Sequence, residues 1–362
     1  FTCELIVENY LSGRRIDTFL ARHFRNYTPY RMQRLVRAGQ VRVEGLPAEC
    51  SQRVFKGQRV WVRLIEPPDK LVLSEPSPVD VLYDDPWLMI VNKAPDQVAH
   101  PGGLTHSGTL LAALQHYLDQ QTPLRGLLRP GIVHRLDRFT SGLLIATKEH
   151  LSHRRLTMHF ERRKVFKSYL AITWGVIEED YQLIDRPLGI VEQSGRRLVS
   201  VRADAHQTRP AWTEVVVLER FRNHTLVAAR PLTGRLHQIR VHLVSVGHPI
   251  LGDEFYGTDR YGLSEEEDEV VADSSDGTIP ADPHDSANER RAAATFGPVT
   301  AVPDAEARPL IARQALHAHQ LCFRHPITEE WMTFEAPLPE DMRIALQRLR
   351  SDHALGKARS QP

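Results

Sequence analysis

The chain has 362 residues, of which 41% are hydrophobic and 25% charged, with a formal net charge of +1 at pH 7. This length and composition exclude a small disulfide-stapled domain and a chain too polar to fold, and they favour two globular domains. The three cysteines make no metal-type spacing, and no apolar run approaches the roughly 18 residues of a membrane helix, so we expect a soluble protein in a reducing cytoplasm.

Residues 11–64 are strongly basic, with twelve Lys or Arg against three Asp or Glu, a net charge of +9. A helix is expected in RRIDTFLARHF because its apolar residues recur at helical intervals, at Ile16, Phe19, Leu20 and Phe24. A second helix is expected in TPYRMQRLVRAG, with Met32, Leu35 and Val36 on one face and a stop at Gly39. The alternation in QVRVEG and GQRVWVRL predicts two short strands.

Arg31, Arg34 and Arg37 are spaced three apart and therefore line one side of the second helix. A solvated basic face is the simple interpretation of such a helix. A net charge of +9 that is nearly all arginine favours an RNA-facing surface instead, since arginine fits phosphate geometry and stacks on bases.

The rest of the chain mixes strands and helices, which predicts the α+β class. A proline-rich linker is expected at 66–78, a larger catalytic domain at 79–350 and a polar tail at 351–362. Strands are expected in GLLIATK, KVFKSYLAITWGV, AWTEVVVLERF, HTLVAARPL and QALHAHQLCFRHPITEEWMTFEAPLP. Residues 264–305 are acidic and poor in large apolar groups, so we expect them to be a disordered insertion.

The sequence has no P-loop, no G-x-S-x-G, no H-E-x-x-H and no C-x-x-C. His237 and His242 are a tempting metal pair within LTGRLHQIRVHLVSVG, which is expected to be helical. Five residues along a helix turn the side chain by about 140°, so the two imidazoles would diverge. We expect no metal site.

The stretch GIVHRLDRFTSGLLIATK places Asp137 in a connection between two strands, where functional residues concentrate. A turn aspartate that caps its own loop amides is the simpler interpretation. Strand alternation puts Lys167 and Tyr169 on the less apolar side of RKVFKSYLAITWG, as expected of a cleft wall. In the expected helix, Arg240 lies one turn from Leu236 and His237, and Arg235, Gln238 and His242 flank its apolar stripe.

Four stretches in this order resemble the motifs of the RluA family of RNA pseudouridine synthases: GIVHRLDRFTSGLLIATK, RKVFKSYLAITWG, RPLTGRLHQIRVHLVSVGHPILGDEFYG and LHAHQLCFRHP. Residues 1–65 resemble a small S4-type RNA-binding domain, as in members that act on large-subunit ribosomal RNA. The resemblance implies a pseudouridine synthase fold with a central mixed, mostly antiparallel sheet.

By this resemblance Asp137 is the catalytic aspartate, Tyr169 the active-site tyrosine and Arg240 the arginine paired with the aspartate. Arg135 would hold the target nucleotide out of its helix, and Lys167, Arg235 and His237 would contact RNA. The isomerisation breaks the C1′–N1 bond, turns the uracil and joins C5 to C1′, without a redox step, so no cofactor is expected. Arg240 near Asp137 would lower the carboxyl pKa by roughly 1–3 units.

Several alternatives stay open. Asp137 could attack C1′, attack the uracil ring or act as a base, and Tyr169 could stack on uracil or exchange a proton. We expect a monomer that acts on large-subunit ribosomal RNA. The RNA partner could instead be tRNA, and the chain could be a non-catalytic RNA-binding ribosome-assembly factor. A glycosidase-type hydrolase would require a second carboxylate about 5–10 Å from Asp137, and no second acidic residue is expected to accompany these motifs.

Overall fold

The computed structural model describes residues 2–25, 27–64, 73–101, 105–122, 125–126, 128–193, 196–256 and 310–359. The expected disordered insertion at 264–305 therefore lies outside the described residues, and so do residues 66–72 of the expected linker. Residues 73–79 form no regular element before the first strand of the large sheet.

The N-terminal region has its own small sheet and its own apolar core. Strands β1 (Thr2–Ile6), β6 (Arg59–Arg63), β3 (Val41–Val43) and β4 (Leu46–Pro47) pair in that order, and β2 (Arg14–Arg15) pairs with β5 (Arg53–Val54). The short 3-10 helix η1 (Asn9–Leu11) precedes α1 (Ile16–His23) and α2 (Pro29–Arg37), and Thr28 caps α2 by accepting the Arg31 N–H. The predicted helices and strands are confirmed, and the seven predicted apolar residues of the two helices are buried together.

The chain after the N-terminal region is built around a ten-stranded sheet. Its main path is β12 (Tyr181–Asp185), β16 (Trp212–Arg220), β17 (His224–Pro231), β11 (Phe166–Trp174), β18 (Leu316–Arg324), β10 (Ser141–Thr147), β8 (Leu88–Lys93) and β7 (Asp80–Asp84). β19 (Trp331–Glu335) pairs with β18, and β9 (Gly131–Ile132) pairs with β10. Among the described strands only β10 and β18 run parallel, so the mixed, mostly antiparallel sheet predicted from the resemblance is confirmed.

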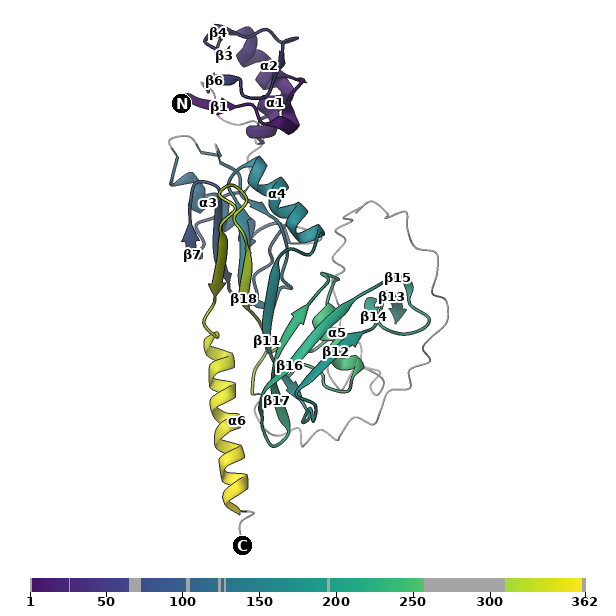
Figure 1. The fold of residues 1–362 in the computed structure, drawn as a ribbon. Coiled ribbons are helices and arrows are strands. Elements are labelled where there is room, and N and C mark those ends of the chain that lie inside the picture. Colours follow the sequence, from purple (N-terminus) through teal and green to yellow (C-terminus); the bar gives the residue numbers. More distant parts are fainter. Residues whose placement is uncertain are drawn as a thin grey trace.

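Four helices and a small second sheet complete this part of the chain. They are α3 (Leu110–Asp119), α4 (His150–Glu161), α5 (Gln238–Ser245), α6 (Glu340–Arg359) and the strands β13 (Leu188–Gln193), β14 (Arg196–Ser200) and β15 (His206–Arg209). α6 runs past residue 350, where the polar tail was expected to begin. Figure 1 shows the N-terminal region at one end of the molecule and α6 extending to the other.

The strand order places β10 and β11 on either side of β18, so segments distant in the sequence become neighbours in the sheet. β18 lies between β10 and β11, and Ala318 of β18 pairs with Gly142 on one side and with Tyr169 on the other. Gly142 has a φ of 112°, and a Cβ there would lie 2.7 Å from the backbone nitrogen of Ala318. The close approach therefore requires glycine, and it sets the loop that precedes β10 beside Tyr169.

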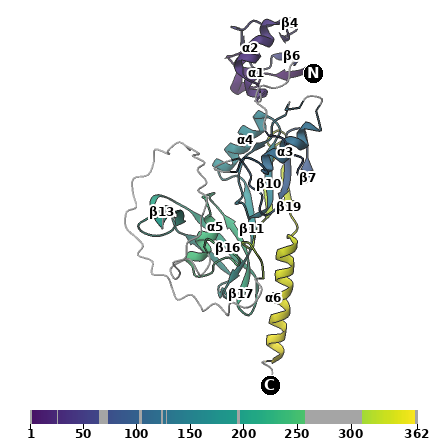
Figure 2. The same ribbon diagram turned by 180° about the vertical axis from the view of Figure 1, so that it is seen from behind.

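The N-terminal region rests on α4, as the views from the two sides agree (Figures 1 and 2). The guanidinium carbon of Arg154 on α4 lies 4.2 Å from the centre of the Tyr10 ring. Arg129 also donates a hydrogen bond to the carbonyl of Arg25 across the same junction.

Candidate active site

The loop between β9 and β10 holds Asp137 in a tight turn, in which the Thr140 N–H donates to the Asp137 carbonyl at 3.1 Å. His134 supports this loop: its Nε2 accepts the Ile145 N–H at 3.0 Å, and its ring stacks on Phe160 with 4.7 Å between centres. Burial, followed by the charge of Lys167, lowers the pKa of His134 to about 3, so the imidazole is neutral and serves the loop structure.

Two buried basic side chains, Lys93 and Arg313, donate hydrogen bonds to backbone carbonyls of the same loop. Lys93, at the end of β8, donates to the carbonyls of Ala94, Gln97 and Arg138 at 2.7 to 3.0 Å, and burial is the main cause that lowers its pKa to about 7. Arg313 donates to the Phe139 carbonyl at 2.9 Å. The sequence reasoning missed both residues, although a lysine closing the apolar strand LMIVNK is a signal that it could have used.

Arg240 connects two carboxylates. Its Nη1 donates to Oδ2 of Asp137 at 3.1 Å, while Nε and Nη2 form a fork on the two oxygens of Asp253 at 2.7 and 2.8 Å. The side chains of Arg240 and Asp253 are 3% and 0% exposed, and that of Asp137 is 20% exposed. Among the described residues, no group of its own loop donates a hydrogen bond to the Asp137 carboxylate. The simpler interpretation, an aspartate that caps the amides of its own turn, was therefore wrong.

The charges around Asp137 favour its ionised form. Burial raises the pKa of this carboxyl group, but His237, Arg240 with its hydrogen bond, and Arg135 lower it by more, so it lies below its ordinary value. His237 is itself uncharged at neutral pH because burial is the main cause that lowers its pKa to about 4. Arg240 therefore supplies the lasting positive charge, and Asp137 is ionised at neutral pH.

Tyr169 lies in β11 and is buried. Burial, and then the negative charge of Asp137, raises the pKa of its phenol well above the ordinary value. The hydroxyl is therefore protonated at neutral pH, which suits a ring that stacks on a base or a hydroxyl that donates a proton. The structure brings Asp137, Arg240 and Tyr169 to one place.

The segment before α5 differs from the predicted helix. α5 begins only at Gln238, because His237 has a positive φ of 51° and the residues before it form a turn. The buried Gln238 amide holds that turn by accepting from Thr233 Oγ1 and the Arg235 N–H and by donating to the Trp212 carbonyl. The prediction that Arg235, Leu236 and His237 are helical was wrong, since these bonds satisfy the polar groups without a helix.

This turn places His237 at the site. Its Nδ1 lies 2.8 Å from the Tyr256 hydroxyl, and its Nε2 lies 4.0 Å from Oδ2 of Asp137. His242 points elsewhere, with Nδ1 on Thr213 and Nε2 on the Arg186 carbonyl. The described residues contain no group of three or more His, Cys, Asp or Glu placed to hold a metal ion.

Other predicted RNA-contacting residues surround the site or lie apart from it. Arg135 is exposed and close enough to lower the pKa of Asp137. Lys167 lies 3.9 Å from the place of a Cβ on Gly234, and burial lowers its pKa to about 8. Burial, then Arg209 and Arg163, lowers the pKa of Arg235, which marks a crowded basic surface. Three further predicted residues lie on α2 in the N-terminal region, away from Asp137: Arg31, Arg34 and Arg37.

A second carboxylate does accompany these motifs, contrary to expectation. Asp253 belongs to the GHPILGDEF stretch, and Arg240 binds both of its oxygens. It is fully buried and also accepts the N–H groups of Phe255 and Tyr256. Such a carboxylate orients Arg240 and has no free oxygen to activate water, so the pair does not form a hydrolase site.

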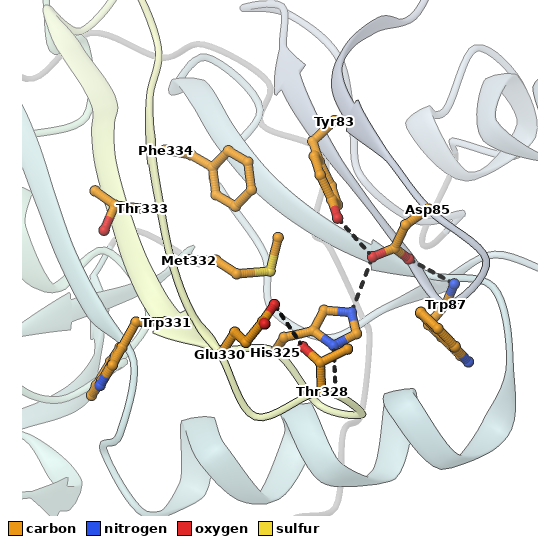
Figure 3. A pocket seen from close by; sticks show the side chains of 10 residues that line it. All are labelled: Tyr83, Asp85, Trp87, His325, Thr328, Glu330, Trp331, Met332, Thr333 and Phe334. Carbon is orange, nitrogen blue, oxygen red and sulfur yellow. Dashed lines mark hydrogen bonds and ion pairs between the residues drawn. The ribbon is translucent and has the colours of Figure 1, made fainter.

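A cavity of about 370 Å³ lies away from Asp137, between the β7–β8 turn and the β18–β19 hairpin (Figure 3). Asp85 lies at its side and accepts hydrogen bonds from the Tyr83 hydroxyl and from the Trp87 and Leu88 N–H groups. His325 Nε2 lies 3.0 Å from the same carboxylate. These groups satisfy one another, so they join the two hairpins.

In the part of the chain that the structure describes, no helix is long and apolar enough to span a membrane.

Comparison with known proteins places this geometry in a family. Residues 88–245 match the RNA pseudouridylate synthase family model. An uncharacterized RNA pseudouridine synthase YlyB of Bacillus subtilis is 34% identical over 340 residues, which cover 94% of this chain and 95% of that protein. The ribosomal large subunit pseudouridine synthase D of Nitrosomonas europaea is 34% identical, over 97% of this chain and 88% of that protein.

A solved structure agrees in fold. The human RNA pseudouridylate synthase domain containing 4 superposes with a TM-score of 0.53 and 22% identity, over 75% of this chain and 93% of that one. The matched segment 88–245 contains Asp137, Tyr169 and Arg240, the three residues that the fold gathers. With relatives above 30% identity along nearly its whole length, the chain belongs to the RNA pseudouridine synthase family.

Proposed function

We propose that this protein converts specific uridines of large-subunit ribosomal RNA to pseudouridine. The observation that carries the proposal is the Asp137–Arg240–Asp253 chain of ion pairs beside Tyr169, in a member of this family. The choice of RNA rests on relatives named for the large ribosomal subunit, such as the Nitrosomonas europaea protein.

Asp137 is the catalytic residue of the proposal. Asp253 balances the charge of Arg240, so the ionised Asp137, the most exposed of the three side chains, presents net negative charge to the substrate. Breaking the C1′–N1 bond develops positive charge at C1′ and negative charge on the uracil. A carboxylate held in this place stabilises C1′ or attacks it, attacks the uracil ring, or later takes the proton from C5.

Tyr169 and the basic residues serve the uracil and the RNA in this proposal. Tyr169 stacks on the base or donates its phenolic proton, and His237 closes the wall beside Asp137. Arg135 and the pocket offset the cost of extruding the uridine, a few kcal/mol. Lys167 and Arg235 contact neighbouring phosphates, and the reaction requires no cofactor or metal.

We further propose that residues 1–65 are an S4-like RNA-binding domain and that residues 79–350 form the catalytic domain of a cytoplasmic monomer. The support is the separate apolar core of the N-terminal region and the exposure of Arg34 and Arg37 on α2.

The test is to map pseudouridines in total RNA from the wild type and from a strain that lacks this gene. The proposal expects specific pseudouridines to disappear from large-subunit ribosomal RNA and to return when the purified protein acts on that RNA. Loss confined to tRNA, or no loss at all, would contradict it.

A further inference from the structure

A basic pocket lies where the N-terminal region meets α4. Its volume is about 310 Å³, and its wall includes Tyr10, Arg14, Thr18, Arg22, His150 and Arg154. The first four side chains come from the N-terminal region, whereas the last two come from α4. The pocket exists only because the two parts of the chain pack together, as the relation of α1 to α4 in Figures 1 and 2 shows.

Three arginines of this pocket lack anionic partners. Arg14, Arg22 and Arg154 are exposed and form no ion pair with any carboxylate in the described ranges. Two acids lie nearby but form no ion pair with these arginines: Glu149 accepts the Leu151 and Ser152 N–H groups at the start of α4, and Glu8 lies 3.4 Å from His23. The arginine charges therefore remain available to an anion from outside the protein.

Charges of both signs surround the pocket: burial, then Glu8 and Glu149, raises the pKa of the Tyr10 hydroxyl, whereas Arg154 and Arg22 lower it. Burial is the main cause that lowers the pKa of His150 to about 4, and Arg25, His23 and Arg22 lower it further. The Tyr10 hydroxyl at the wall is buried and has no hydrogen-bond partner among the described residues. A phosphate group suits the three exposed guanidinium groups, because it carries negative charge and several strong acceptor oxygens.

We propose that the basic pocket binds a backbone phosphate of the substrate RNA through Arg14, Arg22 and Arg154. This rests on the proposed function, in which the substrate is RNA, and it adds a contact that neither α2 nor the active site provides. Because both parts of the chain contribute arginines, one RNA strand bound here holds the N-terminal region against α4. The contact fixes the register of the RNA and reads no base.

The test measures binding of unmodified, in vitro transcribed large-subunit ribosomal RNA to the full-length protein over a range of salt concentrations. The variants are Arg14→Gln, Arg22→Gln and Arg154→Gln, with Arg154→Lys as the variant that keeps the charge. Arg348→Gln is the control, since Arg348 is an exposed arginine on α6 at the opposite end of the molecule. Thermal unfolding is recorded for each variant.

Each glutamine variant is expected to bind about two- to fivefold more weakly, the size of an exposed charge contact. The slope of log K against log salt should become shallower by about 0.7 to 0.9, as for one lost phosphate contact. Arg154→Lys should regain most of the affinity and the slope. Arg348→Gln should match the wild type.

Three outcomes overturn the proposal or separate it from the proposed function. Glutamine variants that bind like Arg348→Gln would overturn the phosphate site while leaving the enzymatic assignment intact. Weaker binding with an unchanged salt slope would also overturn it, since no phosphate contact would have been lost. A wild-type protein that does not bind this RNA would refute the proposed function and this site together.

Discussion

Replacing Asp253 by asparagine tests how the charge of Arg240 is held. The substitution keeps the shape of the side chain and removes the charge that the guanidinium fork binds at 2.7 and 2.8 Å. Both partners are almost fully buried, so Arg240 would keep Asp137 as its one anionic partner among the described side chains. Breaking a buried ion pair from one side costs about 3–5 kcal/mol, and we expect a loss of that order in the free energy of unfolding.

Urea unfolding at pH 7 measures this loss, with pseudouridine formation assayed on the folded fraction. Activity should fall as well, because Arg240 would no longer be oriented toward Asp137. Asp180→Asn is the matched control, since Asp180 forms an exposed ion pair with Arg220 and its loss should change stability little. If Asp253→Asn changed stability and activity as little as Asp180→Asn, the reasoning about the buried pair would be refuted.

Three further predictions concern the residues that support the site and Tyr169 within it. Gly142→Ala should destabilise the protein strongly, because its Cβ would clash with the Ala318 backbone. Gly234→Ala is the control and should change stability little, because the nearest atom would lie 3.9 Å from its Cβ. Thermal unfolding compares the stabilities of the two variants. The pKa of Lys93 is lower in the folded protein than its ordinary value, so Lys93 binds fewer protons when folded, and stability should rise between pH about 7 and 10.5. Lys93→Met should lack this part of the rise in urea unfolding, and an identical pH dependence would contradict the assignment. Tyr169→Phe should keep RNA affinity and slow pseudouridine formation if the hydroxyl donates a proton; an unchanged rate would restrict Tyr169 to stacking.

Local patterns predicted the elements that bury one face. The spacing of apolar residues such as Phe19 and Leu20 identified α1, and β-type alternation identified β16. The strand β11 was also predicted, although it is buried on both faces from Ser168 to Thr173. These patterns succeed because each element buries its apolar side chains in one core, α1 in that of the N-terminal region and β16 in that of the large sheet. The start of α5 was missed because Gln238 satisfies the turn through its side chain, which periodicity does not reveal.

The geometry of the site required more than local patterns. Asp137 and Arg240 are 103 residues apart, and only the resemblance to a family indicated that they meet. Lys93 and Arg313 were missed because they bind backbone carbonyls, and any loop residue presents such a carbonyl whatever its side chain. Asp253 stood in the quoted motif, but its role follows from the fork of Arg240, which depends on three-dimensional packing.

The most direct test of the central claim is Asp137→Asn, assayed for pseudouridine formation and for RNA binding with the same large-subunit ribosomal RNA. The asparagine keeps the size of the side chain and can still accept a hydrogen bond from Arg240, so the fold and the RNA affinity should be retained. We predict that pseudouridine formation is abolished. Turnover at the wild-type rate would contradict the assignment of Asp137 as the catalytic residue.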